Sequence, residues 1–552
     1  MFDSATDNSI KETEAVIVRI IKDGKPVNRL LGIAELKHAH ADGILEAVSD
    51  QFMRVKQENF KENLVSFCAD GASVNHGETG GVKAKLRQQC PWMIGIWCLP
   101  HRLELAVMGM IKANESASEV MRLLDFLYKT YHYSCKSRRE LHMMAEQLGF
   151  QSRNPSRATG TRWCPHLAKA LTILLSDSGK YAVITQHAEH ISVTSKNSNV
   201  QGRAKFVLKR LETFKFAAFC HFLLDLLTTI SKLSLFLQSE RTILPSAVAA
   251  IQTCLTAVET MDVRVQPGGH LEAFLKMTAS LQQSDEVVSL QGVILKKTPE
   301  EIDTDLNTLP LTLSRDIKVS ARKTAEGLSD RFKALLGGTH WDDITDGAAK
   351  AVACFKIFNP DTWPDNIPEL SSHGEEQLQY LIEWFRSRLI RNRCDVNAVI
   401  HQWRLFKQLV SAEFQDKNYT SLYAVLLTKE PYKTDFKDLL HLIQVMLVIP
   451  VTSASCERIF SAQKRIKSDS RSSLGVETLE DLIRISGDGP SLQDFTPQPA
   501  VLRWIKCSTR PRRPLYKQWP AELEVETSYS DSTFSDSCCC SDDVTDTMLF
   551  RI

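Results

Sequence analysis

The stretch Pro450–Ile485, PVTSASCERIFSAQKRIKSDSRSSLGVETLEDLIRI, constrains this chain more than any other. It opens with a proline and a Thr/Ser cluster, which are typical of a helix boundary. Ser453 is a candidate N-cap, and Glu457 then falls in the first helical turn, where the helix dipole favours a carboxylate. Apolar residues follow at near-helical spacing, with a break around residues 472–475. The stretch therefore predicts an amphipathic helical segment interrupted once.

Length and charge limit the classes of protein that this chain can be. With 552 residues, the chain can bury several cores, so two or three domains are expected. The 67 Lys and Arg against 66 Asp and Glu give a formal charge of +1, so any nucleic-acid surface must be a local patch. Hydrophobic content of 43% and charged content of 24% are those of a soluble globular protein.

Membrane insertion and secretion are not expected from the sequence. The most apolar segment, Phe214–Leu237, is interrupted by Lys215, His221, Asp225 and Lys232, so no run is predicted to span a bilayer. The first residues lack the layout of a signal peptide. Of the 14 cysteines, most are scattered singly, which is typical of reduced, buried thiols. A reducing compartment, the cytoplasm or nucleus, is therefore expected.

The first hundred residues predict mixed α/β structure. Strands are expected at Met1–Phe2 (as the stump of a truncated strand), 14–21, 29–36, 64–69 and 93–98, with a hairpin turn at Asp23-Gly24. Helices are expected at 41–55, at 82–89 and from about His101. From about residue 168 to 440 helical periods dominate, and residues 282–309 are expected to be a loop or an extended helical connection. Residues 508–552 are rich first in Pro and Arg, then in Ser and acidic residues, which predicts a disordered tail.

Three acidic residues stand at positions where a carboxylate can act on phosphate chemistry. Asp3 follows the first strand in FDSATD, Asp70 follows a strand in CADGASVN, and Glu457 lies in SCERIFS. Such acids, when they converge on one sheet edge, can hold two divalent metals for phosphoryl transfer. Each also has a structural interpretation, because Asp is a turn former and Glu a helix cap.

Together, the SxxxERxFS and KxxxRSSLxxxxLEDLI patterns resemble the C-terminal dimerisation segment of the hAT superfamily of DNA transposases. The contexts of Asp3, Asp70 and Glu457 resemble the catalytic acids of that family, which implies that these residues bind Mg²⁺ or Mn²⁺. The resemblance also implies an α/β RNase H-like core interrupted by a large all-α insertion, predominantly helical overall. It implies dimer contacts by Arg458, Phe460, Leu479 and Leu482.

Two short motifs resemble further elements of the family. Cys98 and His101 in CLPH resemble its CxxH element, but a structural zinc site usually takes four ligands, so zinc is not expected and a buried histidine is favoured. Arg162 and Trp163 in TRW resemble an element that contacts phosphate and stacks on an unpaired base. A Trp buried between sheet and helices explains the motif equally well.

Basic residues cluster near these motifs, and two interpretations of them stay open. One set can form a phosphate-binding strip or a solvated face; it consists of Lys83, Lys85, Arg87, Arg153, Arg157 and Arg162. The same two interpretations apply to a second set after Glu457, Lys464, Arg465, Lys467 and Arg471.

The expected domains are an N-terminal part of the core (1–167, first strand truncated), a helical insertion (168–440), a C-terminal dimerisation segment (441–507) and a tail (508–552). The resemblance is strongest to the vertebrate zinc-finger-protein-like group of hAT-derived proteins, yet the sequence has no CxxC…HxxxH module. We therefore expect a domesticated protein that acts mainly as a homodimer, in the nucleus and associated with DNA or chromatin. The alternative is an active metal-dependent transposase or nuclease. Neither a membrane nor a small-molecule substrate is expected.

Overall fold

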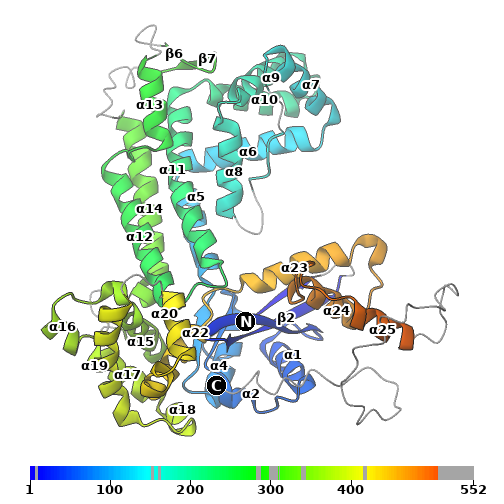
Figure 1. Cartoon of the computed structure of the whole chain (residues 1–552). Helices are drawn as coiled ribbons and strands as arrows, with labels where there is room; N and C mark the ends of the chain where they lie inside the picture. The colour runs from blue at the N-terminus through cyan, green and yellow to red at the C-terminus, as the bar shows by residue number, and fades with distance from the viewer. Residues whose placement is uncertain are drawn as a thin grey trace.

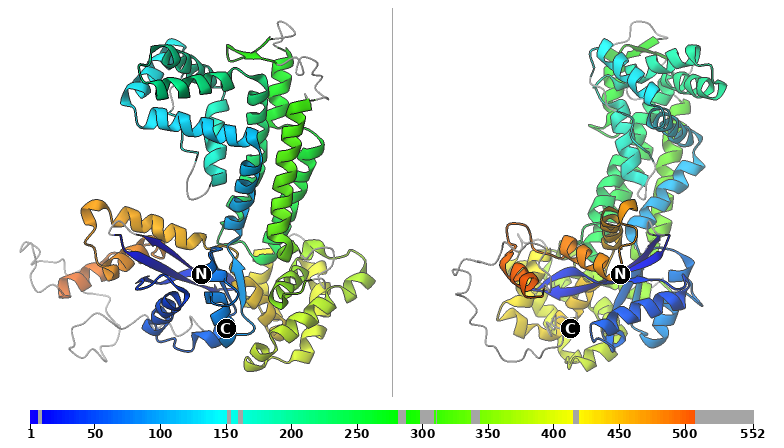
Figure 2. Two further views of the ribbon diagram at one scale, coloured as in Figure 1. Left: turned by 180° about the vertical axis from the view of Figure 1, so that it is seen from behind. Right: turned by 90° about the vertical axis from the view of Figure 1, so that its right-hand side faces the viewer.

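The computed structural model describes residues 1–6, 10–150, 154–158, 163–280, 287–297, 309, 311–336, 344–414 and 419–507. The chain is predominantly helical, as expected. A sheet-containing base carries a tall helical lobe and a second helical group beside it (Figures 1 and 2).

The base is built around a three-stranded antiparallel sheet in the order β1-β2-β3. These strands are β1 (Phe2–Thr6), β2 (Glu12–Lys22) and β3 (Lys25–Glu35). β2 and β3 form a hairpin whose turn residues Asp23 and Gly24 both have positive φ, +51° and +72°. This is the backbone of the two-residue turn that the Asp-Gly pair predicts. The register of β2 on β3 shifts between Val16 and Ile17, a bulge that adds to the twist of the sheet.

Two further strands lie parallel to one another, β4 (Ser66–Ala69) and β5 (Ile94–Trp97). β4 lies beside β1, where the rings of Phe2 and Phe67 stack with centroids 5.6 Å apart. The helices between the strands are α1 (Ala41–Arg54), α2 (Phe60–Asn63), α3 (Ser73–His76) and α4 (Val82–Gln89). The predicted strands and longer helices occur in the expected order. The short helices α2 and α3 were not predicted, and β1 extends to Thr6, so Asp3 lies within the first strand and not after it.

The tall lobe is helical. It contains α5 (Leu99–Ala113), α6 (Glu115–His132), α7 (Cys135–Gln147), α8 (Trp163–Leu175), α9 (Lys180–Thr194), α10 (Ser198–Leu211), α11 (Phe214–Leu237), α12 (Leu244–Val263), α13 (His270–Ser280) and α14 (Leu311–Leu336). α5, α11, α12 and α14 pack on one another as a stalk that rises from the base (Figure 1). α6 and α7 already belong to this lobe, although they precede residue 168.

A short hairpin is the main difference from the predicted elements. Residues 282–309 were expected to hold a loop or an extended helical connection, but β6 (Val287–Leu290) and β7 (Val293–Lys296) pair antiparallel there. The turn residues Gln291 and Gly292 both have positive φ, +52° and +86°. The prediction was wrong because a Gln-Gly pair is a weaker hairpin signal than Asn-Gly or Asp-Gly.

α11 is long and apolar enough to cross a membrane by length and composition, contrary to the expectation from its polar interruptions. Of its most apolar window, however, 67% is buried inside the protein. It packs against α8, α12 and α13, so it behaves as the central core helix of the lobe. No other helix in the described ranges passes the same test.

A second helical group lies beside the base, on the left of Figure 1. It comprises α15 (Gly347–Cys354), η3 (Phe355–Phe358), η4 (Pro360–Thr362), α16 (Ile367–Ser372), α17 (Glu375–Trp384), α18 (Arg386–Arg391), α19 (Val396–Glu413), α20 (Tyr419–Thr428) and α21 (Tyr432–Asp435). Its core is aromatic, with Trp403 and Phe406 fully buried. The rings of Trp363 and Trp403 meet edge to face at 5.6 Å.

The last helices return to the sheet. They are α22 (Lys437–Val448), α23 (Ala454–Ile466), η5 (Asp469–Arg471), α24 (Val476–Gly487) and α25 (Gln498–Cys507). α22 and α23 pack on β2, and α24 packs on β3. Segments more than 400 residues apart in sequence therefore share one core. The predicted tail, 508–552, lies outside the described residues.

Candidate functional site

Asp3 lies in β1, opposite Ala15 of β2, and is half-buried. Burial and the nearby charges of Asp70 and Glu457 together raise the pKa of its carboxyl group to about 7. The backbone N–H of Ser4 donates to Asp3 Oδ1 at 3.0 Å and partly offsets this effect. The structure thus brings the three predicted acids within electrostatic reach of one another.

Asp70 is held in a fixed orientation at the end of β4. Its Oδ1 accepts hydrogen bonds from the Ala72 backbone N–H at 3.1 Å and from Asn75 Nδ2 at 2.7 Å. Asn75 is buried, which explains why an asparagine follows five residues after the acid. Gly71 is required next to Asp70, because a Cβ atom there would lie 2.1 Å from the indole ring of Trp97.

Glu457 reaches this edge because α23 packs on β1 and β2. The helix is tied down by contacts on either side of Glu457. Asn28 Nδ2 donates to Ser455 Oγ at 2.9 Å, and Gln463 Nε2 donates to Thr13 Oγ1 at 3.2 Å. Ser453 occupies the N-cap position as predicted, but its side chain makes no capping hydrogen bond. Thr452 Oγ1 instead accepts from the Ala454 N–H at 3.1 Å.

A fourth acid, Glu14, lies beside Asp3 and was missed by the sequence analysis. It is fully buried in β2, and Ser4 Oγ donates to its Oε2 at 2.6 Å. Burial raises its pKa to about 8, with smaller contributions from Asp3 and Asp70. A carboxyl group with this pKa is mostly protonated at neutral pH. Its position in an otherwise apolar strand, EAVIVRII, was the only signal in the sequence.

The donor chemistry at this edge suits a hard divalent cation, because carboxylate oxygens are the ligands that Mg²⁺ and Mn²⁺ prefer. The mutual repulsion that raises the pKa of Asp3 is also what a bound cation relieves. Within the described ranges, however, no three His, Cys, Asp or Glu side chains are grouped closely enough to hold a metal ion. The three acids therefore match the cation in donor chemistry, but they do not form a ligand cluster in this structure.

The segment that carries Glu457 is integral to the sheet. Buried side chains of α23 and α24 form one hydrophobic core with β2 and β3; they include Ala15, Ile17, Leu30, Ile33, Cys456, Phe460, Leu479 and Ile483. Arg484 donates from Nη1 to the Leu30 carbonyl oxygen at 2.6 Å, and Glu480 Oε2 accepts from the Ile33 N–H at 3.1 Å.

Comparison with known families identifies this segment. Residues 408–488, from the last turns of α19 to the end of α24, match the family model of the hAT family C-terminal dimerisation region. This chain carries a hAT dimerisation region. The match supports membership of the hAT family and the formation of a homodimer.

Two of the four predicted dimer contacts lie inside the monomer. In the hAT dimerisation region, Leu479 is fully buried and Phe460 is 8% exposed, both against the sheet. A partner cannot touch them while this packing is intact, so their packing role is within the chain. Leu482 is half-buried, and Arg458 is half-exposed and forms an ion pair with Glu240. Apolar side chains near the end of the region are more accessible, namely Ile485, Leu492 and Phe495.

Cys98 and His101 do not act together. Cys98 is buried just before α5, where its Sγ accepts a hydrogen bond from the Ser453 N–H at 3.4 Å. A hydrogen bond from Cys68 lowers the pKa of Cys98 to about 6, although burial opposes this. His101 is exposed, which contradicts the expected buried histidine. Cys98 thus joins the base to the loop between α22 and α23, within the hAT dimerisation region.

The TRW motif is only partly described. Arg162 lies outside the described residues, and so does Arg153. Trp163 begins α8 and is half-buried. Its proposed stacking on a base stays a prediction.

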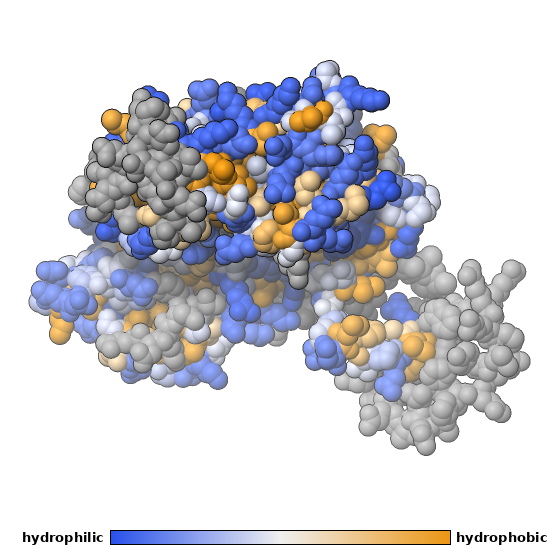
Figure 3. Space-filling model, turned by 90° about the horizontal axis from the view of Figure 1, so that it is seen from above, coloured by the Kyte–Doolittle hydropathy of each residue, from blue (hydrophilic) through white to orange (hydrophobic). Residues whose placement is uncertain are grey.

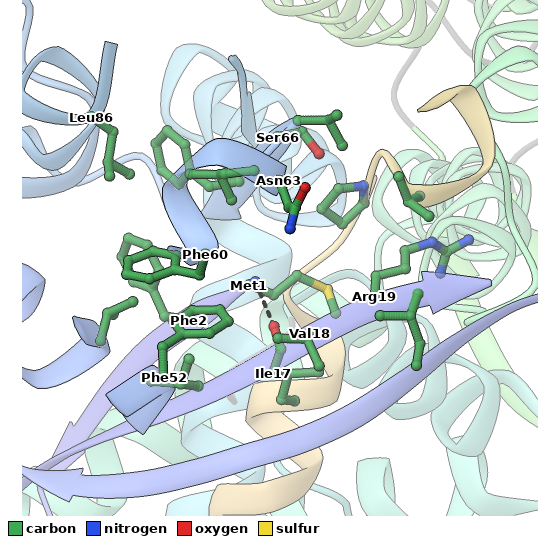
Figure 4. A pocket seen from close by; sticks show the side chains of 18 of the residues that line it. Met1, Phe2, Ile17, Val18, Arg19, Phe52, Phe60, Asn63, Ser66 and Leu86 are labelled. Atoms are coloured by element: carbon green, nitrogen blue, oxygen red, sulfur yellow. Dashed lines mark hydrogen bonds between the residues drawn. The ribbon is translucent and has the colours of Figure 1, made fainter. Parts of the chain in front are cut away.

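An apolar cavity of about 140 Å³ lies away from the acids, between β2 and the helices α1 and α2. Figure 4 shows Phe2, Phe52 and Phe60 gathered on one side of it. Met1, just before β1, continues the pairing with β2: its amino group donates to the Ile17 carbonyl oxygen at 2.7 Å. Beyond Ile17, no described strand pairs with this edge of β2. The cavity offers apolar packing and none of the candidate catalytic acids.

Proposed function

We propose that this protein is a domesticated relative of hAT transposases that acts as a homodimeric scaffold in a nuclear, DNA- or chromatin-associated complex. The observation that carries the proposal is the match of residues 408–488 to the hAT dimerisation region. The antiparallel sheet β1-β2-β3, with the parallel pair β4-β5 beside β1, supports an RNase H-like core. The sequence motifs further favour a relationship to the vertebrate zinc-finger-protein-like group of hAT-derived proteins.

The contact surface follows from burial. Phe460 and Leu479 are buried within the monomer. The apolar side chains at and beyond the end of α24 are therefore more accessible to a partner. Ile485 is 70% exposed and Leu492 is 91% exposed. α24 and α25 project from the base at the right of Figure 1, and hydrophobic residues are interspersed on the projecting part at the right of Figure 3. Exposed apolar clusters of this kind mark association surfaces.

Sedimentation equilibrium of the full chain tests this assignment. We expect Leu492→Asp and Ile485→Asp each to weaken the dimer at least tenfold, because a carboxylate in an apolar interface must be desolvated. Val263→Asp is the matched control, since Val263 is 82% exposed at the end of α12. Equal association of all three variants and the wild type would contradict the proposed surface.

A second candidate function is metal-dependent cleavage and transfer of DNA strands, which the electrostatic coupling of Asp3 to Asp70 and Glu457 favours. Bound Mg²⁺ or Mn²⁺ would activate the attacking oxygen and stabilise the leaving oxygen. Asp3, Asp70 and Glu457 would hold the cations, and Asn75 keeps Asp70 in one orientation. Glu14, protonated at neutral pH, adds no further negative charge behind Asp3.

Nicking of hairpin-prone DNA in the presence of Mg²⁺ or Mn²⁺ tests this candidate. An active protein should lose at least a hundredfold in rate on Asp70→Asn, because the amide removes one negative ligand. Equal rates for Asp70→Asn and the wild type, or no nicking by either, would exclude strand cleavage and leave the dimeric scaffold standing.

A further inference from the structure

A small cavity lies behind the acidic edge, where α4, β5 and the start of α5 meet the end of α14 and the start of α15. Its volume is about 100 Å³. On the same measure a single water needs only about 10–15 Å³, so the cavity has room for a small polyatomic ion. The polar residues of its lining are Lys83, Arg87, Trp97, Arg102 and Asp346. We call it the α4–α15 cavity.

Positive charge in the α4–α15 cavity exceeds negative charge. Lys83, Arg87 and Arg102 face a single carboxylate of the lining, Asp346, whose Oδ1 lies 3.8 Å from Arg87 Nη2. Arg102 Nη1 donates to the Arg331 carbonyl oxygen at 2.9 Å, and its guanidinium lies over the Trp97 ring at 5.0 Å. Within the described ranges Arg102 forms no ion pair with a carboxylate. A largely buried cation without a counter-charge is costly, so the cavity favours an anion.

Hydrogen-bond donors around the α4–α15 cavity are also unused. Arg87 Nε, Trp97 Nε1 and Arg102 Nε are buried and have no acceptor among the described residues. All three groups can only donate. Buried donors are paired in the large majority of cases, and three unpaired ones around one cavity indicate an acceptor-rich ligand.

The start of α15 adds to this preference. Ala348 and Ala349, in its first turn, line the same cavity. Unsatisfied N–H groups and the positive end of a helix dipole favour anions there, although the Ala348 N–H already donates to Asp346 Oδ1 at 3.0 Å. Burial lowers the pKa of Arg102 to about 10, and burial and the neighbouring Arg87 lower that of Lys83, as expected for crowded cations.

We propose that the α4–α15 cavity binds a phosphate group through Lys83, Arg87 and Arg102, with the indole N–H of Trp97 as a further donor. Guanidinium groups bind tetrahedral oxyanions by paired hydrogen bonds. The oxygens of one phosphate group can accept hydrogen bonds from several of these donors at once. The Trp97 indole also packs against Gly71, next to Asp70. A phosphate group bound here therefore lies beside the acidic edge, where it can anchor the backbone of a nucleic acid. The site does not depend on catalysis or on dimerisation.

Isothermal titration of the full-length protein with inorganic phosphate, and separately with a single-stranded DNA oligonucleotide, tests the site at constant ionic strength. We expect binding of phosphate, and at least a tenfold loss of affinity on Arg87→Gln and on Arg102→Gln. Lys85→Gln is the matched control, because Lys85 lies on the same helix but pairs with Asp42 of α1 at 2.7 Å. Arg87 is 29% exposed, so its replacement keeps the test informative if Arg102→Gln impairs folding.

The two titrations distinguish the sources of the phosphate group. Oligonucleotide binding that competes with phosphate and weakens on Arg87→Gln assigns the site to a nucleic-acid backbone. Binding of inorganic phosphate alone, with the same sensitivity, assigns it to a free ion. Absence of phosphate binding, or affinities unchanged by Arg87→Gln, would overturn the proposal. Sedimentation of the same samples reports the dimer independently.

Discussion

Asp3 shows how single residues of this chain are adjusted by their surroundings. Its carboxyl group is largely removed from water and lies near two other acids, so its pKa is raised from 3.8 to about 7. Glu14 behind it is raised from 4.5 to about 8. Raised carboxyl pKa values mean that the folded state holds protons more tightly than the unfolded state. Both groups therefore destabilise the fold as they ionise.

This linkage gives a prediction for pH. The contribution of Asp3 is most favourable below about pH 4 and is lost as the pH rises through about 7, because ionisation is then costlier in the folded state. Asp3→Asn removes the charge, so it should raise the free energy of unfolding at pH 8 by about 1–2 kcal/mol and have little effect at pH 4. Urea unfolding at both pH values measures the difference. Asp50→Asn, an exposed change on α1, should show no such pH dependence, and a flat profile for Asp3→Asn would refute the burial argument.

At the residue scale the sequence predicted that Asp3, Asp70 and Glu457 are candidate site residues, because each lies in a distinct short motif. It did not predict Glu14, since a lone acid in a strand carries no motif and its burial depends on β1 and on Ser4. Burial of Phe460 and Leu479 within the monomer was also missed. Amphipathic spacing predicts that one face of a helix is buried. It does not show whether that face packs against the same chain or against a partner.

At the scale of elements, α24 is fastened to β3 by one buried carboxylate. Glu480 is 5% exposed; its Oε2 accepts from the Ile33 N–H and lies 3.1 Å from Arg54 Nη1. Arg484 Nη2 lies 2.7 Å from Glu480 Oε1 and the same guanidinium donates to β3. The pKa of Glu480 is lowered by Arg484 and by the Ile33 N–H, even though burial opposes this. The helix is thus held by a network that bridges the bulged strand.

Glu480→Ala should loosen this network. It leaves the Ile33 N–H without an acceptor and Arg484 without its carboxylate, so we expect a loss of about 2–4 kcal/mol in the free energy of unfolding. Glu477→Ala, an exposed change one turn earlier in α24, should cost less than about 0.5 kcal/mol. Chemical unfolding followed by circular dichroism measures both. Similar losses in the two variants would show that the buried network does not hold α24.

Elements with strong periodicity were predictable from the sequence, and those that depend on an unusual turn were not. β2, β3 and α1 follow from alternating or helical apolar spacing and from the Asp-Gly turn. The β6–β7 hairpin depends on Gln291 and Gly292 at positive φ and on its packing beside α13 and α9. Neither condition can be read from a short segment of sequence.

At the scale of the whole molecule, the chain leaves the sheet after β5 and returns to it at α22, more than 300 residues later. Arg19 of β2 connects the sheet to α22 and to the stalk. Its guanidinium donates to the Leu447 carbonyl oxygen of α22 at 3.0 Å. It also donates to the Glu240 and Thr242 carbonyl oxygens, near the foot of the stalk, at 2.7 and 3.1 Å. The sequence placed the helical block between Asp70 and Glu457. It could not give the stalk, which depends on contacts between distant helices.

Arg19→Leu should therefore weaken the junction of the sheet, α22 and the stalk. The change removes four hydrogen bonds from a charged donor, three of them to α22 and the foot of the stalk and one to Asn28 of β3. We therefore expect a loss of about 2–4 kcal/mol in the free energy of unfolding. Arg29→Leu is the control, because Arg29 is partly exposed and its ion pair with Asp488 is 3.6 Å long. A smaller loss for Arg19→Leu than for Arg29→Leu would contradict the role of Arg19 as a junction residue.

The most direct test of the proposed function is the mass of the purified full-length chain by sedimentation equilibrium at micromolar concentration. A homodimer formed through the hAT dimerisation region should sediment at twice the chain mass of 62.2 kDa. Leu492→Asp should shift the distribution towards 62.2 kDa, and Val263→Asp should leave it unchanged. A wild-type protein that stays at 62.2 kDa across that concentration range would contradict the homodimer.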